Sequence, residues 1–240
     1  IEIISIGLFI FIGFVGFSYI RNSEKQNIWV GLSRETAHQL GTPVSALLGW
    51  LEYLKHDKND LANVLPEIES DIDRLQQVSR RFSKMGSKPV IENFNLSKRV
   101  NSTLDYLEKR MPSMGGKVDL INNIDTDVKI KANGTLISWA VENLIRNGID
   151  SIDKDNGQIE VALKQDSNYI KIHISDNGCG IPKKDWKNIF RPGFSTKKSG
   201  WGLGLSLCQR IVNDVHVGKI CVLESKLNVG TTFEITIPKT

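Results

Sequence analysis

Two glycine-rich segments could bring backbone close to a nucleotide, and the first contains a carboxylate. Asp176 closes a hydrophobic strand pattern and is followed by Gly178 and Gly180. Its carboxylate could accept a hydrogen bond from an adenine amino group at a point where only glycine allows close approach. Taken alone, this short motif also occurs in ordinary turns that bind no ligand. It becomes informative only beside further signals for a nucleotide.

The second glycine-rich segment stands directly before an amphipathic helical pattern. Gly200, Gly202 and Gly204 would leave backbone N–H groups free where the helix dipole favours phosphate oxygens, although such a turn could equally be a mobile loop. Asn147, on another helical pattern, has an amide oxygen able to bind Mg²⁺, or is a surface asparagine or a cap. These signals occur together and in a consistent order, so they predict a site for ATP and Mg²⁺.

A histidine far upstream could accept a phosphoryl group. His38 falls one residue past a core position of a helical repeat, so its ring should lie at the flank, where solvent or another domain can reach it. Glu35 and Thr42 share its helix face. Pro43 removes a backbone hydrogen bond and should bend the helix there. We interpret the other histidines as solvated surface residues: His56, His173 and His216.

Two helical repeats surround and follow this histidine. Apolar or small residues recur in alternating steps of three and four from Val30 to Leu54, and a second set runs from Leu61 to Phe82 after a polar turn. We expect an antiparallel helical hairpin with an open apolar seam. Two hairpins related by a twofold axis would close that seam into a four-helix bundle, which predicts a homodimer. The alternative is that the hairpin packs on its own downstream domain.

The C-terminal part, from about Asn95, mixes both kinds of pattern. It predicts an α+β sandwich in which helices cover one face of a mixed sheet. Lys84 to Asn93, which contains glycine, serine and proline, is the expected hinge. The expected helices are 96–109, 136–151 and 203–213, and the expected strands are 118–121, 159–164, 169–175, 219–225 and 231–237.

The first residues form an uncharged apolar run. Residues 3–20 would cover ~27 Å as a helix, near the thickness of a bilayer core, so we predict a transmembrane helix; a signal peptide and a buried core helix are the alternatives. Basic residues follow the run, which favours a cytoplasmic location for everything after it. Because the chain opens on Ile1, we expect it to be a fragment. The predicted division is 1–21 membrane helix, 22–88 dimerisation hairpin and 89–240 catalytic ATP-binding domain.

Composition excludes several other classes of protein. The net charge of +4 over 240 residues is mild and the basic residues are scattered, which argues against a nucleic-acid partner. Three cysteines without a CxxC pair argue for a reducing compartment and against a disulfide framework or a zinc site.

Six motifs in order resemble the transmitter core of a bacterial sensor histidine kinase, in the family that shares the Bergerat (GHKL) ATP-binding fold. The resemblance covers roughly residues 25–240 and includes a HisKA-like dimerisation domain. The motifs are ETAHQLGTP at 35–43 (H box), NLIRN at 143–147 (N box), DNGCGIP at 176–182 (G1 box), IFRPGFSTK at 189–197 (F box), GWGLGL at 200–205 (G2 box) and GTTF at 230–233.

The resemblance implies a role for each matching position. Asn147 is the implied Mg²⁺ ligand, with Asn143 near the phosphates, and Asp176 binds adenine with Thr231 beside it. A lid over about 185–203 would be anchored by two phenylalanines. The residues implied for the lid and the phosphates are Phe190, Arg191, Phe194, Lys197, Gly202, Leu203 and Gly204.

The implied reaction is autophosphorylation of His38 by ATP, followed by transfer to an aspartate of a cytoplasmic response regulator at the bacterial inner membrane. Many relatives carry an acid directly after the histidine, whereas Gln39 cannot take a proton, so Glu35 is our hypothesis for the base. Thr42 matches a position that assists phosphatase activity in relatives. Two alternatives stay open. One is an ATP-driven conformational machine like type II topoisomerases or heat-shock chaperones, which have glutamate at the position of Asn143; the other is a catalytically silent dimeric scaffold.

Overall fold

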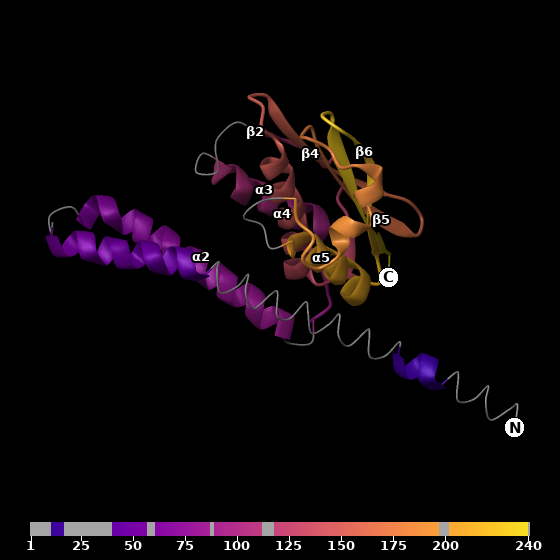
Figure 1. Cartoon of the computed structure of the whole chain (residues 1–240), viewed down its shortest axis with the longest axis horizontal. Coiled ribbons are helices and arrows are strands. Elements are labelled where there is room, and N and C mark those ends of the chain that lie inside the picture. The colour runs from indigo at the N-terminus through magenta and orange to yellow at the C-terminus, as the bar shows by residue number, and fades with distance from the viewer. Residues whose placement is uncertain are drawn as a thin grey trace, which may run out of the picture. The chain divides into compact units, whose positions relative to one another are not determined.

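The computed structural model describes residues 11–16, 40–56, 61–86, 89–111, 118–196 and 202–239 (Figure 1). The chain divides into two compact units, Ile1–Leu75 and Gln76–Thr240. The predicted site residues Glu35, His38 and Gln39 lie outside the described residues, as do Lys197 and Gly200.

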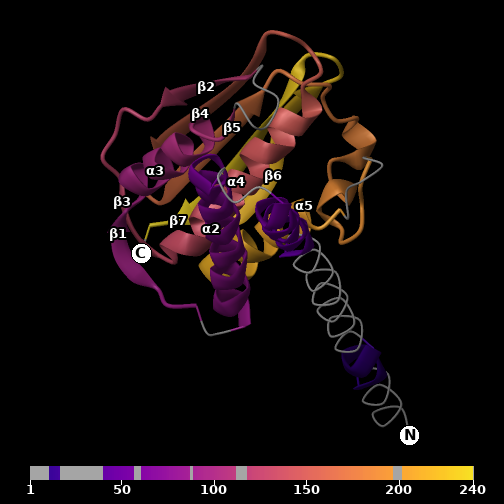
Figure 2. The same cartoon turned by 90° about the vertical axis from the view of Figure 1, so that its left-hand side faces the viewer.

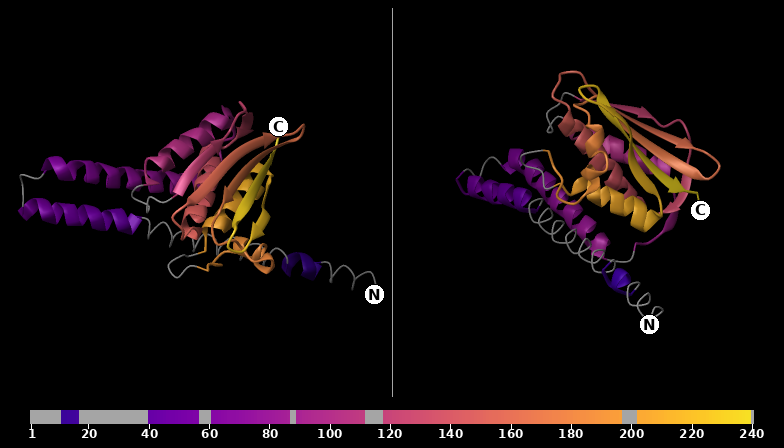
Figure 3. Two further views of the ribbon diagram at one scale, coloured as in Figure 1. Left: turned by 90° about the horizontal axis from the view of Figure 1, so that it is seen from above. Right: turned by 45° about the vertical axis from the view of Figure 1, so that its right-hand side comes forward.

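The first unit contains a pair of helices. Residues 40–56 are helical and run beside helix α2 (Leu61–Gly86), which continues beyond the unit (Figures 1 and 3). The described part of the hairpin is therefore helical, as predicted. Val64 is buried, but several large apolar side chains of the pair remain exposed. These exposed side chains are Val44, Leu48, Leu51, Leu61, Leu65 and Ile72.

The predicted membrane helix lies mostly outside the described residues. Only residues 11–16 of the run 3–20 are described, and they are helical. Within the described parts of the chain, we find no helix with the length and apolar character needed to cross a membrane.

The second unit is built on a five-stranded mixed sheet. The strand order is β2-β4-β5-β7-β6, with β2 and β4 parallel and the other neighbours antiparallel. A separate two-stranded antiparallel sheet joins β1 and β3. The strands are β1 (Glu92–Asn95), β2 (Val118–Asn123), β3 (Lys129–Ala132), β4 (Gly157–Gln165), β5 (Tyr169–Asp176), β6 (Lys219–Lys226) and β7 (Gly230–Pro238).

Helices cover one face of the large sheet (Figures 2 and 3). Alternate residues of the central strands are buried against them: Ile170, Ile172 and Ile174 of β5 are almost completely buried, whereas their neighbours are partly exposed. The predicted α+β sandwich with a mixed sheet is confirmed. The helices of this unit are α3 (Leu96–Glu108), α4 (Gly134–Ser151), α5 (Gly204–Arg210) with the π-helix η5 (Ile211–Val215), and the 3-10 turns η3 (Lys183–Asp185) and η4 (Asn188–Phe190).

Two features of this unit differ from expectation. Strands β1 and β3 were not predicted, because each has only four residues and too short an alternation to identify a strand. The expected hinge, Lys84 to Asn93, is shorter than predicted, because α2 continues to Gly86 and β1 already begins at Glu92.

The surface interpretation was wrong for two histidines. His216 is buried at the end of η5, where its Nε2 accepts a hydrogen bond from the Asn133 N–H at 3.0 Å. Its Nδ1 therefore carries the proton and donates to the Ile211 carbonyl at 2.7 Å. His173 is half-buried, with Nε2 2.8 Å from Oε2 of Glu234. Both rings are shielded from solvent and bonded to protein groups, so neither is a solvated surface residue.

Candidate nucleotide-binding site

Asp176 lies where the sheet meets the helical layer. It continues the row of β5 residues that faces the helices, and its strand neighbours are Ile159 on β4 and Thr231 on β7. Its Oδ1 accepts hydrogen bonds from the Gly178 N–H at 2.9 Å and the Ser151 hydroxyl at 3.2 Å. Burial raises the pKa of this carboxyl above its ordinary value, and these hydrogen bonds oppose the shift.

Glycines surround this carboxylate at positions where a side chain would collide. A Cβ on Gly148 of α4 would lie 3.2 Å from the Asp176 Cβ, and one on Gly178 would lie 2.7 Å from the Ser151 carbonyl oxygen. Gly230 has φ +146° and packs on the Asp176 backbone, where a Cβ would lie 2.9 Å from the Asp176 carbonyl carbon. Real Cβ atoms rarely tolerate such distances. The backbone thus approaches Asp176 from three sides.

The loop after Asp176 is fastened to β6 and to the turn that follows it. Gly180 has φ +73° and packs on the Lys226 backbone, where a Cβ would lie 3.0 Å from the Leu227 Cα. The Cys179 carbonyl accepts a hydrogen bond from the Asn228 N–H at 2.8 Å, and the Cys179 N–H donates to the Ser151 carbonyl at 3.0 Å. The G1 segment is therefore held from both sides.

Helix α4 supplies the two asparagines. The Asn133 side chain caps it by accepting from the Leu136 N–H at 3.0 Å, and its apolar face is buried against the sheet. Asn143 lies against the start of α5, since a Cβ on Gly204 would be 3.6 Å from its Oδ1. The Asn143 Nδ2 is buried and has no hydrogen-bond partner among the described residues. Asn147, one turn later, is half-buried.

This donor set suits Mg²⁺ better than a metal that needs a protein cage. No cluster of three or more His, Cys, Asp or Glu side chains with metal-binding geometry occurs among the residues that the structure describes. Mg²⁺ prefers oxygen donors, keeps several waters and usually binds together with substrate phosphates. The half-buried Asn147 amide offers an oxygen for such a shared site, and the unpartnered Nδ2 of Asn143, one helical turn earlier, can donate to a phosphate oxygen there.

The described ends of the predicted lid are anchored to the domain. The Phe190 ring packs edge-on to Phe233 of β7, with ring centroids 6.5 Å apart. The Gly193 N–H donates to the Gly202 carbonyl at 3.1 Å, which joins the two ends of the lid. Gly202 has φ +65°, a conformation that glycine adopts without strain. Leu203 follows as the N-cap of α5.

The structure brings one predicted group together around Asp176: Gly178, Gly180 and Thr231. It brings a second group to the contact between α4 and α5: Asn143, Gly202, Leu203 and Gly204, with Asn147 one helical turn away. Thr42 belongs to the helical residues 40–56 of the other unit.

Sequence reasoning missed three residues that shape the site. Ser151 bonds Asp176, and Gly148 makes room for it. The Ser225 hydroxyl lies 2.9 Å from the Thr231 hydroxyl and accepts from the Ile181 N–H at 2.7 Å, so it joins the G1 loop to β7. Gly148 directly follows the N box, which could have drawn attention to it. Nothing in the local sequence of Ser225 could have identified its role.

Comparison with known proteins gives a consistent result. Residues 132–240 match the family described as histidine kinase-, DNA gyrase B-, and HSP90-like ATPase. The chain is 33% identical over 210 residues to the signal transduction histidine-protein kinase AtoS of Escherichia coli (strain K12), a match that covers 84% of this chain. It spans only 33% of the length of AtoS.

Solved structures of histidine kinases are similar in fold. The catalytic domain of the histidine kinase ThkA matches with a TM-score of 0.56 and 32% identity, over 62% of this chain and 96% of that one. ThkA has also been solved in complex with the response regulator protein TrrA. That match has a TM-score of 0.57 and 25% identity, and covers 91% of this chain and 64% of that one.

Proposed function

Because the chain belongs to the family of histidine kinase-, DNA gyrase B- and HSP90-like ATPases, we propose that it is an ATP-dependent protein-histidine kinase that phosphorylates its own His38. The observation that carries the proposal is the glycine-lined cradle around Asp176, followed by Asn143 against the first turn of α5. The first part suits an adenine ring and the second suits its phosphates.

The residues of the proposed site have distinct tasks in this reaction. Asp176 accepts a hydrogen bond from the adenine amino group, with Thr231 beside it. The backbone N–H groups of Gly202 to Gly204 and the Lys197 side chain hold the phosphates. Mg²⁺, when bound by Asn147, supplies positive charge that disperses the negative charge of the transferring group. The protein thereby contributes positioning and electrostatic stabilisation, as is usual for phosphoryl transfer.

The step itself exchanges one bond to phosphorus for another. Nε2 of His38 attacks the γ-phosphorus, the bond from that phosphorus to the bridging oxygen breaks, and ADP leaves with the electron pair. The proton on the other ring nitrogen passes to a base, for which we propose Glu35, because Gln39 can orient the ring but cannot accept a proton. A Glu35→Gln variant that autophosphorylates at the normal rate would remove this role from Glu35.

The phosphoryl group then passes to an aspartate of a response regulator. Support comes from ThkA, a similar kinase solved in complex with such a protein. Thr42, one helical turn after His38, would assist hydrolysis of the phosphorylated aspartate, a phosphatase activity that releases inorganic phosphate, by orienting the attacking water. We further propose that this chain acts at the bacterial inner membrane, anchored by residues 3–20, with 22–88 as the dimerisation hairpin and 89–240 as the cytoplasmic catalytic domain.

The exposed apolar side chains of the hairpin support a homodimer. Val44, Leu48 and Leu51 on the helical residues 40–56 are exposed, as are Leu65 and Ile72 of α2. A second copy of the hairpin would bury these side chains in a four-helix bundle. Sedimentation of the full chain in detergent should therefore give twice the protomer mass.

One assay separates this function from the alternative of an ATP-driven machine. The full chain is incubated with ATP labelled on the γ-phosphate and with Mg²⁺, and both protein-bound label and free phosphate are counted. A kinase retains label that is lost in acid and stable in base, and His38→Gln retains none. A machine of the topoisomerase or chaperone kind releases the label as phosphate, and a silent scaffold binds nucleotide without changing it.

A further inference from the structure

Three polar residues form one row across the sheet at the end that carries Asp176. Asp176 of β5 is paired with Thr231 of β7, and Thr231 is paired in turn with Ser225 of β6. Residues paired in this way point to the same face of a sheet, with Cβ atoms about 5 Å apart. Thr231 is only 4% exposed. Ser225 is thus one strand further from Asp176, on the far side of Thr231.

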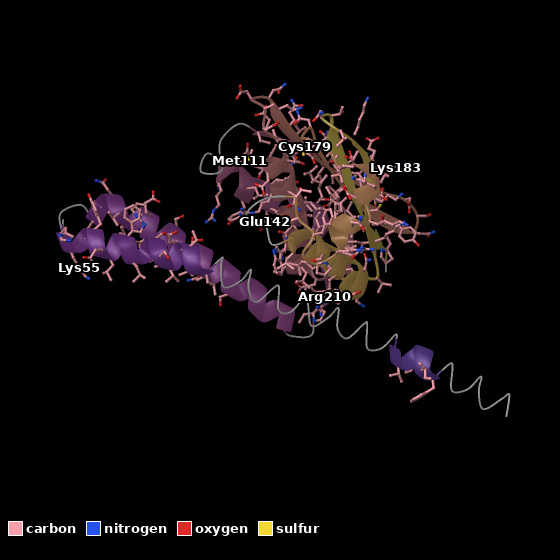
Figure 4. All side chains as sticks on the ribbon, viewed as in Figure 1. Lys55, Met111, Glu142, Cys179, Lys183 and Arg210 are labelled. Atoms are coloured by element: carbon pink, nitrogen blue, oxygen red, sulfur yellow. The ribbon has the colours of Figure 1, made fainter. Side chains whose placement is uncertain are left out.

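The hydroxyl of Ser225 has three hydrogen-bond neighbours but only one proton. It accepts from the N–H of Ile181, which lies two residues after Cys179, labelled in Figure 4, at 2.7 Å. It donates to the Gly230 carbonyl at 3.0 Å. The third neighbour is the Thr231 hydroxyl at 2.9 Å. Because a hydroxyl has one proton and two lone pairs, Ser225 has a lone pair left for Thr231, and no proton.

This count fixes the direction of the Thr231 hydroxyl. A hydrogen bond between two hydroxyls needs one donor, and Ser225 has already given its proton to the carbonyl, so Thr231 donates to Ser225. The reverse direction would take this donor away from the carbonyl of Gly230, which is a buried residue. The proton of Thr231 therefore points toward Ser225, and only lone pairs of its hydroxyl face a ligand at Asp176.

Asp176 is an acceptor as well. Burial raises the pKa of this carboxyl, and hydrogen bonds from the Gly178 N–H, the Ser151 hydroxyl and the Thr231 N–H oppose the shift. The last of these bonds also places Thr231 in contact with Asp176. An ionised carboxylate has no proton to donate. The two residues therefore present acceptors, and no donor from either side chain, to a base bound between them.

We propose that Ser225 makes the site selective for adenine over guanine by holding the Thr231 hydroxyl as an acceptor. This inference rests on the proposed function. The 6-amino group of adenine has two N–H bonds, and it can donate one to Asp176 and the other to Thr231. Ser225 touches neither the base nor the phosphates, so it is a positioning residue that acts through Thr231.

Guanine shows why the neighbour of the carboxylate decides the selectivity. A carboxylate alone also suits the N1–H and the 2-amino group of guanine, which can both donate to it. That orientation brings the guanine carbonyl oxygen beside the carboxylate, where a donor hydroxyl would bind it. With the proton of Thr231 committed to Ser225, the oxygen meets lone pairs instead and loses the hydrogen bonds that it makes in water.

The experiment compares two nucleotides on the full chain. Isothermal titration with ADP and with GDP, both with Mg²⁺, gives the base selectivity as the ratio of the two dissociation constants. The unaltered chain should prefer ADP by about a hundredfold or more. In Ser225→Ala the Thr231 proton is free to turn toward the ligand, so the ratio should fall about tenfold, as adenine loses a hydrogen bond and guanine gains one. Ser225→Thr, which keeps the hydroxyl, should retain the ratio.

A double-mutant cycle separates this role from a structural one. Ser225 also fastens the G1 loop through Ile181, so its loss would weaken both nucleotides if it acted only on the loop. Thr231→Val removes the hydroxyl and keeps the shape of the side chain, and should lower ADP affinity without lowering GDP affinity. In the Thr231→Val background, Ser225→Ala should leave the ratio unchanged. Thermal unfolding identifies variants that misfold, and Thr231→Val alone decides the outcome if Ser225→Ala is among them.

Several results would overturn the assignment while leaving the proposed kinase activity intact. One is equal affinity for ADP and GDP in the unaltered chain. Others are an equal loss of both nucleotides in Ser225→Ala, a change of the ratio that persists in the Thr231→Val background, or a loss of GDP affinity in Thr231→Val alone. If the unaltered chain binds neither nucleotide, the proposed function fails, and the assignment of Ser225 fails with it.

Discussion

Replacing Gly178 by alanine tests whether the backbone must approach Asp176 as closely as the structure indicates. The new Cβ would lie 2.7 Å from the Ser151 carbonyl oxygen and closer still to the Ser151 hydroxyl. The hydroxyl can rotate away only by giving up its hydrogen bonds to the Gly148 carbonyl and to Asp176. The carbonyl is fixed by its hydrogen bond from the Cys179 N–H. The backbone must therefore shift.

The expected cost combines two contributions. Overpacking a rigid site costs about 1–3 kcal/mol, and a displaced hydrogen bond costs about 1 kcal/mol. The free energy of unfolding should thus fall by about 2–4 kcal/mol. For a domain of this size, the melting temperature should fall by about 5–15 °C. ADP affinity should fall as well, because the moved backbone holds the Asp176 carboxylate.

Gly204→Ala is the matched control, and both variants are measured by thermal unfolding and ADP titration. A Cβ there would meet only the Asn143 Oδ1 at 3.6 Å, an ordinary contact, at the first residue of a helix that favours alanine. Its stability should be unchanged or slightly higher. If Gly178→Ala melts and binds ADP like the unaltered chain, the close approach around Asp176 is not required.

Three further changes have defined outcomes. Burial raises the pKa of Asp176, so its ionised form lowers the free energy of unfolding at neutral pH. Asp176→Asn should therefore raise the free energy of unfolding at pH 7 while ADP affinity falls by about tenfold or more. A loss of stability that accompanies the loss of ADP affinity would contradict this. Burial lowers the pKa of His216, so the stability that its neutral ring provides is fully present above the unfolded value of 6.5 and is lost as pH falls through the lower folded value. Urea unfolding of the unaltered chain and His216→Gln should therefore differ most above pH 6.5 and converge in acid, whereas a constant difference would refute the assignment. Val217, an exposed β-branched residue at φ +51°, is strained, so Val217→Gly should raise the free energy of unfolding by about 1 kcal/mol, and a loss of stability would argue against strain.

The sequence predicted the elements with long periodic patterns and missed those defined by distant contacts. Helix α4 and strands β5 and β7 repeat apolar residues often enough to be identified, and the fold class follows from their order. Strands β1 and β3 hold four residues each and depend on pairing with one another between distant positions, such as Glu92 and Ala132, which are 40 positions apart in the sequence. Such pairing leaves no periodic pattern in either segment.

The candidate site shows the same division. Asp176, Gly178 and Asn143 belong to recognisable motifs, so their types and spacing were enough to select them. His216 was misinterpreted because its partner, the Asn133 N–H, lies 83 positions away, and a ring between two backbone groups has no sequence signature. Ser225 belongs to none of the six motifs, and only the structure shows that its hydroxyl lies against that of Thr231.

Locating the phosphoryl group by mass spectrometry tests the central claim most directly. The full chain is incubated with ATP and Mg²⁺ and digested at alkaline pH, where phosphohistidine survives, and each of the four histidines is then examined. The account predicts phosphate on His38 and none on His56, His173 or His216, with much less phosphate on His38 in Asp176→Asn at an ATP concentration that just saturates the unaltered chain. Phosphate on another histidine, or an unchanged amount on His38 in Asp176→Asn, would contradict it.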